Sequence, residues 1–97
     1  MIDVSTDEGK SELIAKLRRR EEAGLIGQHR YFNPNDMSPC CLVGHMNEIF
    51  DVRQGEISLR EANDWDFDIL NNLTTINDES GPTVAIDVLA SRLGVTE

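Results

Sequence analysis

Cys41 and His45 stand four residues apart, a spacing that places both side chains on one side of a helix. A thiol beside an imidazole is the arrangement of a nucleophile and its general base. The sequence supplies no evident third group to orient the imidazole and no turn of the nucleophile-elbow type. We therefore interpret Cys41 and His45 as two neutral core residues, and a Cys–His enzyme as the less favoured alternative.

A zinc site would need Cys40 or Cys41 together with His29 and His45. The paired Cys-x-x-Cys spacing typical of structural zinc sites is absent from the sequence. The chain also lacks a phosphate-binding glycine loop and a dinucleotide fingerprint. We expect no metal and no cofactor.

Asp64, Asp66 and Asp68 alternate along the chain as the first three ligands of a calcium loop do. The remaining positions do not fit, because Ile69 stands where the loop needs glycine and Thr75 where it needs glutamate. We interpret the triplet as part of an anionic surface.

The elements that must position these residues are predicted to be helices. Ser38 and Pro39 suit the cap and first position of a central, most buried helix through residues 40–50. This helix is expected to end near residues 51–55, with Gly55 as the stop signal. Gly44 in its middle indicates that another backbone passes close, and a helix–helix contact is the preferred explanation. One face carries the apolar residues at helical spacing, namely Leu42, Met46, Ile49 and Phe50.

Three further helices are predicted from caps and apolar spacing. The first starts at a capping box, Ser5 with Glu8, and runs to about residue 23, where Gly24 ends it. Another starts at Ser58 and reaches residue 77, and the last follows a Thr83 cap. The last helix ends at Gly94 and buries a side formed by Val84, Val88, Leu89 and Leu93. The predicted fold is all-α, a compact bundle of four to five short helices in a single domain, residues 1–97.

The connections carry their own predictions. Residues 25–32 read as an ordered crossing segment with Tyr31 or Phe32 in the core, and residues 33–36 read as a turn. Residues 77–82 read as a break between the last two helices. There, Asn77 or Asp78 is expected to cap neighbouring backbone.

The net charge of the 97 residues is −9, and it is unevenly spread. Residues 1–44 hold seven acids and six bases, net −1, whereas residues 45–97 hold eleven acids and three bases, net −8. A polyanionic half repels nucleic acid and attracts a basic surface. The only basic cluster is interpreted as a solvated helix face: Lys16, Arg18, Arg19 and Arg20.

The composition, with 39% apolar and 28% charged residues, is that of an ordinary globular domain. No apolar run approaches the ~18 residues of a membrane span. The acidic start does not resemble a signal peptide, and adjacent cysteines on a helix point apart. These features predict a cytoplasmic protein without a disulfide.

Residues 28–93 resemble a group of small uncharacterised helical proteins of bacteria and tailed phages. The resemblance rests on the Cys40-Cys41-Leu42-Val43-Gly44 helix and on Asn77-Asp78 before the last helix. The group usually places glycine directly after Cys-Leu or Cys-Ala-Leu, whereas Val43 intervenes here. The resemblance implies a compact helical domain of phage or mobile-element origin and carries no activity.

The expected function is that of a non-enzymatic, acidic protein-binding module. Its anionic half would dock on a basic protein surface, as an inhibitor or nucleic-acid mimic of a host defence or nucleic-acid-handling complex. The alternative is an assembly subunit or homodimer that associates through Trp65 or Phe67. The expected contact residues are Asp51, Glu56, Glu61, Asp64, Asp66 and Asp68.

Overall fold

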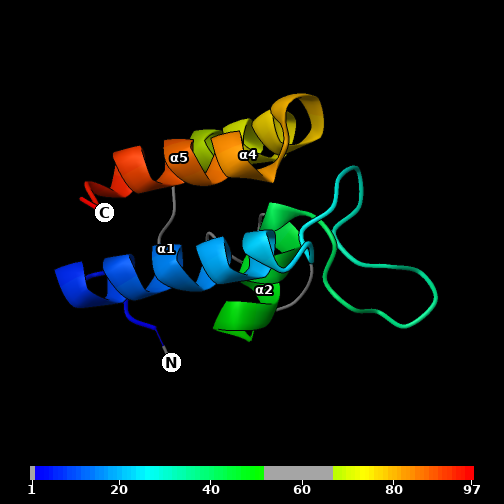
Figure 1. The fold of residues 1–97 in the computed structure, drawn as a ribbon, viewed down its shortest axis with the longest axis horizontal. Coiled ribbons are helices and arrows are strands. Elements are labelled where there is room, and N and C mark those ends of the chain that lie inside the picture. The colour runs from blue at the N-terminus through cyan, green and yellow to red at the C-terminus, as the bar shows by residue number, and fades with distance from the viewer. Residues whose placement is uncertain (1, 52–66) are drawn as a thin grey trace.

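The computed structural model describes residues 2–51 and 67–97. In this part of the chain all regular structure is helical: α1 (Asp7–Glu22), α2 (Leu42–Phe50), α4 (Phe67–Ser80) and α5 (Pro82–Leu93). Helices α4 and α5 pack against each other, α1 packs along α5, and α2 contacts α4 and α5. Figure 1 shows α1 running alongside α5, with the shorter α2 crossing behind the C-terminal part of α1 and a long loop projecting from one end. The predicted all-α class is confirmed. The predicted start at Ser58 lies outside the described residues.

The N-cap of α1 lies one residue after the predicted N-cap. The Thr6 hydroxyl accepts a hydrogen bond from the Gly9 N–H at 3.0 Å, which makes Thr6 the N-cap. Ser5, the predicted cap, instead donates its hydroxyl to the Asp3 carboxylate at 2.6 Å. The predicted end is confirmed, since Gly24 follows the last turn with a φ of +72° that favours glycine.

The most buried of these helices is α2, in which seven of nine residues are buried. It begins at Leu42 with Cys41 as its N-cap, so the predicted start at Ser38 and Pro39 is wrong. The backbone there is extended, because the Cys40 N–H donates to Tyr31 O at 2.9 Å and the Cys41 N–H to Arg30 O at 2.8 Å. These N–H groups pair with a distant segment, so helix formation cannot reach back to Pro39.

Gly44 lies directly beneath the crossing segment. A Cβ atom at this position would stand 1.8 Å from the Tyr31 carbonyl oxygen. The predicted close approach of another backbone is confirmed, but that backbone is the extended segment through Tyr31 and not a helix. Tyr31 itself is half-buried and packs against the core, as predicted.

Asn77 and Asp78 lie inside α4, which continues to Ser80. The break predicted for residues 77–82 is therefore limited to Gly81. The buried Asn77 amide donates to Gly27 O at 2.9 Å, and the Asp78 carboxylate accepts the His29 N–H at 2.8 Å. Both residues do bind backbone, as predicted. The backbone they bind belongs to the crossing segment and not to the junction with α5.

Helix α5 also differs from its predicted start. Gly81 is the N-cap, and the Thr83 hydroxyl donates to the Glu21 carboxylate of α1, so Thr83 is not the cap. Val84 is 42% exposed, which contradicts its predicted place in the core. The predicted end at Gly94 is confirmed. The buried face consists of Ala85, Ile86, Leu89 and Ala90.

The core collects large apolar side chains from all four described helices. Its largest fully buried members are Leu13, Ile14, Leu17, Leu42, Val43, Met46, Leu70, Leu73, Ile86 and Leu89. None of the described helices is long and apolar enough to cross a membrane.

Gly44→Ala is predicted to destabilise the fold by roughly 2–3 kcal/mol, because the new methyl group cannot share space with the Tyr31 carbonyl. Urea unfolding followed by circular dichroism measures the change. Asn71→Ala at an exposed site of α4 is the control and should change stability by less than about 0.5 kcal/mol. Equal stability of the two variants would contradict the observed packing.

Candidate functional site

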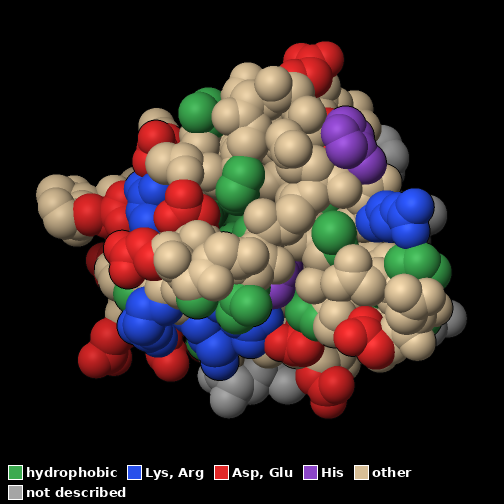
Figure 2. All heavy atoms as spheres, turned by 45° about the vertical axis from the view of Figure 1, so that its right-hand side comes forward, with side chains coloured by type: hydrophobic (Ala, Val, Ile, Leu, Met, Phe, Trp, Pro, Cys, Tyr) green, Lys and Arg blue, Asp and Glu red, His purple; other side chains and the backbone are tan. Residues whose placement is uncertain are grey.

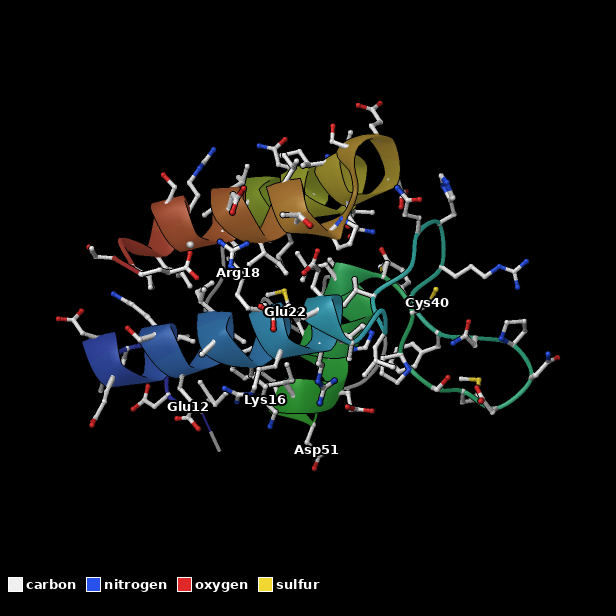
Figure 3. All side chains as sticks on the ribbon, in the orientation of Figure 1. Glu12, Lys16, Arg18, Glu22, Cys40 and Asp51 are labelled. Carbon is white, nitrogen blue, oxygen red and sulfur yellow. The ribbon has the colours of Figure 1, made fainter. Side chains whose placement is uncertain are left out.

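The predicted anionic contact surface falls largely outside the described part of the chain. Asp51 is exposed as the left-handed C-cap of α2, with φ 54°, and Figure 3 shows it pointing away from the other helices. Asp68 is the second residue of α4. The other predicted contact residues lie outside the described residues: Glu56, Glu61, Asp64 and Asp66.

Four described acids of the second half stand at the C-terminal ends of helices, which favour the opposite charge. The last turn of α2 contains Glu48 and is followed by Asp51, and the last turn of α4 contains Asp78 and Glu79. Neither helix has a basic residue in its last turn. The C-terminal end of a helix carries a partial negative charge, so these carboxylates add to it. A cationic partner would relieve that repulsion.

Two of the four residues in the basic cluster of α1, Arg18 and Arg20, are engaged in ion pairs. Arg18 lies 2.6 Å from carboxylate oxygens of both Asp87 and Glu97, and Figure 3 shows it extending from α1 toward α5. The hydrogen bond to Glu97 is the main cause that raises the pKa of Arg18 above its usual value. Arg20 lies 2.7 Å from Glu48 of α2. These two arginines therefore hold helices together, whereas Arg19 of the same cluster is exposed.

His45 is buried, with both ring nitrogens engaged. Its Nδ1 lies 3.0 Å from Arg20 Nη1, and its Nε2 lies 3.0 Å from Leu25 O. Because arginine can only donate, Nδ1 must accept, and Nε2 carries the proton that it donates to Leu25 O. Burial, and secondarily the charge of Arg20, lowers the pKa of His45 below its usual value. His45 is thus a neutral link between α1 and α2 with no nitrogen left to serve Cys41.

Cys41 is buried, and burial raises the pKa of its thiol. A protonated thiol is a weak nucleophile, which favours the core interpretation. Cys41 nevertheless lines a hollow of about 190 Å³ together with His29 and Asp78. His29 Nδ1 lies 3.8 Å from an Asp78 carboxylate oxygen. Sequence analysis missed this grouping, because the three side chains come from segments 12 to 49 residues apart.

Zinc ligands do not converge in the described residues, where no three His, Cys, Asp or Glu side chains are placed to hold one metal ion. The sulfur of Cys40 lies near the crossing segment, 3.9 Å from Gln28 O.

A larger groove lies above His45, with a volume of about 440 Å³. Its walls come from the end of α1, the loop of residues 33–39, and α2. The face of Figure 2, with the loop end turned forward, shows positive and negative side chains interleaved. No sequence pattern indicates this groove, since its walls meet only through tertiary contacts. The lining residues are Arg20, Gly24, Leu25, Asn33, Ser38, Pro39, His45 and Glu48.

Comparison of the chain with protein-family models, with curated proteins and with solved structures found no match.

Stability is predicted to fall as the pH drops below about 6.5. The folded state holds His45 neutral, so the unfolded chain takes up a proton first, which lowers the free energy of the unfolded state. Urea unfolding should show a lower free energy of unfolding at pH 5.5 than at pH 7.5 for the unsubstituted protein. The difference between the two pH values should be smaller for His45→Gln. His29→Gln, which removes the 72% exposed imidazole, is the control and should keep the native loss. An unchanged pH dependence in His45→Gln would contradict the assignment.

Cys41 is predicted to resist alkylation in the native state, because its sulfur is buried and protonated. Iodoacetamide labelling followed by mass spectrometry should modify the half-buried Cys40 first and reach Cys41 only in denaturant. Cys40→Ser and Cys41→Ser variants assign the two sites. Native labelling of Cys41 faster than Cys40 would revive the interpretation as a Cys–His enzyme.

Proposed function

We propose that the protein is a non-enzymatic, acidic binding module that docks its anionic second half on a basic protein surface. The observation that carries this proposal is the charge division. Residues 45–97 carry a net −8, while Arg18 and Arg20 of the first half are tied to carboxylates. A surface of this kind steers a cationic partner toward it and discriminates against anionic ones.

The state of the two reactive side chains supports a binding role over a catalytic one. His45 has both nitrogens engaged and Cys41 has a thiol of raised pKa. A catalytic pair needs a thiol that ionises and an imidazole that can take its proton. Neither condition is met by these two residues.

The partner class follows from the same charge. Proteins that handle nucleic acid present basic surfaces to phosphate backbones, and a carboxylate-rich module competes for them as a nucleic-acid mimic. The resemblance to small phage and bacterial proteins is in keeping with an inhibitor of a host defence or nucleic-acid-handling complex. A homodimer through Trp65 or Phe67 is the structural alternative, and Trp65 lies outside the described residues.

The test is an affinity capture from the source host with the native chain and with a variant in which Asp64, Asp66 and Asp68 become asparagine. The native chain should retain proteins with basic surfaces, and rising salt should elute them because screening weakens exposed charge pairs. The triple variant should lose them.

A charge-matched control changes three exposed acids of α1, Glu8, Glu12 and Glu22, to glutamine. This control should retain the same proteins as the native chain. Capture that survives both high salt and the triple asparagine variant would refute the electrostatic proposal.

A further inference from the structure

We propose that the projecting loop, residues 32–39, is a docking element that inserts the Met37 side chain into an apolar pocket on a protein partner. Figure 1 shows this loop extending past the ends of the helices. The loop shares with the proposed function only that the chain binds a protein, because the anionic half takes no part in this contact.

The loop carries apolar side chains that lie outside the core. Half of its eight residues are apolar, namely Phe32, Pro34, Met37 and Pro39. Met37 is 55% exposed, Pro34 is exposed, and Phe32 is half-buried without belonging to the core cluster. Apolar groups gathered on one exposed loop are typical of a contact with another protein.

Hydrogen bonds within the loop fix its shape. The Asn33 N–H donates to Ser38 O at 2.8 Å, and the Met37 N–H donates to Asn33 O at 2.9 Å. Phe32 and Pro39 face each other as an antiparallel bridge pair, so their side chains lie on one face of the loop. A loop that is already fixed in shape loses less conformational entropy when it binds.

Met37 is held in a conformation that methionine rarely adopts. Its φ is +60°, in the left-handed region that favours glycine. Such strain persists only where the surrounding structure imposes it, and it is concentrated at binding sites. The unbranched thioether of methionine adapts to irregular apolar pockets and makes favourable contacts with aromatic rings. Met37 therefore suits the part of the loop that enters the partner.

The charge of the loop favours a protein over other partners. Asp36 is its only charged residue, and the hydrogen bonds it accepts from the Ser38 N–H and hydroxyl hold its pKa below the usual value. Asp36 and the net charge of −9 repel a phosphate backbone or an anionic membrane, and a second copy of the chain would bring the same −9. A protein pocket with an apolar floor and a cationic or N–H-bearing rim fits both Met37 and Asp36.

The test begins with a crosslink from the side chain itself. The full chain is prepared with photo-methionine in place of methionine, mixed with an extract of the source host and irradiated, and mass spectrometry locates the crosslinks. A host protein should be joined through residue 37, with none joined through the fully buried residue 46. No host protein joined through residue 37, or a second copy of the chain joined there, would refute the docking element.

The crosslinked protein is then purified and titrated with the native chain at about 0.5 M salt, which screens exposed charge pairs. Met37→Asn, which replaces the thioether by a polar group that tolerates the left-handed backbone, should weaken the affinity roughly tenfold. Phe32→Ser should weaken it about fivefold. Val84→Ser, at a 42% exposed apolar site of α5, is the matched control and should lose less than about twofold. Circular dichroism verifies that each variant remains folded.

The outcomes separate this contact from the proposed function. Normal binding by Met37→Asn, with binding lost when Asp64, Asp66 and Asp68 become asparagine, would overturn the loop assignment and leave the proposed function standing. The opposite pattern would support the loop and overturn the electrostatic docking. Crosslinking of residue 37 to phosphatidylcholine vesicles in place of a host protein would identify a membrane contact and overturn the protein pocket.

Discussion

The structure depends on one extended segment laid across the helices by its backbone. The N–H groups of Cys40 and Cys41 bind the carbonyl groups of Tyr31 and Arg30, and the Tyr31 carbonyl rests on Gly44. Buried backbone groups must be paired, so a segment that leaves helical geometry needs partners of this kind. Two residues of α4 supply the remaining ones, since Asn77 binds Gly27 O and Asp78 binds the His29 N–H. The segment is thus part of the packed interior on one side.

The two hollows beside Cys41 and His45 exist because of this segment. The smaller hollow takes His29 and Tyr31 from it, and the groove takes Asn33 and Pro39 from its loop. In the same closure Arg20 of α1 binds His45 and Glu48. Within the described part of residues 45–97, the excess carboxylates take no part in the ion pairs that join the helices. This links the way the chain folds to the charge that a partner would meet.

Local signals in the sequence predicted what depends on local geometry. The all-α class, the glycine ends at Gly24 and Gly94, and the close approach over Gly44 all follow from helical spacing and glycine chemistry. The starts of α2 and α5 were missed, because their backbone and side-chain groups bind segments far along the chain. Thr83 has the right chemistry for a cap, yet its hydroxyl finds Glu21 of α1. A capping signal cannot reveal such a competitor.

The candidate site likewise combines features set by local sequence with features set by contacts between distant segments. Cys41 and His45 are four residues apart, but each side chain contacts residues that are distant in the sequence. His45 binds Arg20, 25 residues away, and Cys41 shares a hollow with Asp78. The groove is invisible in the sequence for that reason. Net charge, by contrast, does not depend on tertiary contacts, so the difference in net charge between the two halves is known from composition alone.

Amide hydrogen exchange tests the central constraint most directly. The N–H groups of Gly27, Cys40 and Cys41 donate to backbone oxygens at 2.7–2.9 Å, which places them inside the cooperative structure. They should exchange as slowly as amides in the middle of α2, and far more slowly than the amide of Asn35 at the exposed loop tip. Exchange of these three amides at the rate of Asn35 would mean that the segment is not held by the helices, and would contradict the account.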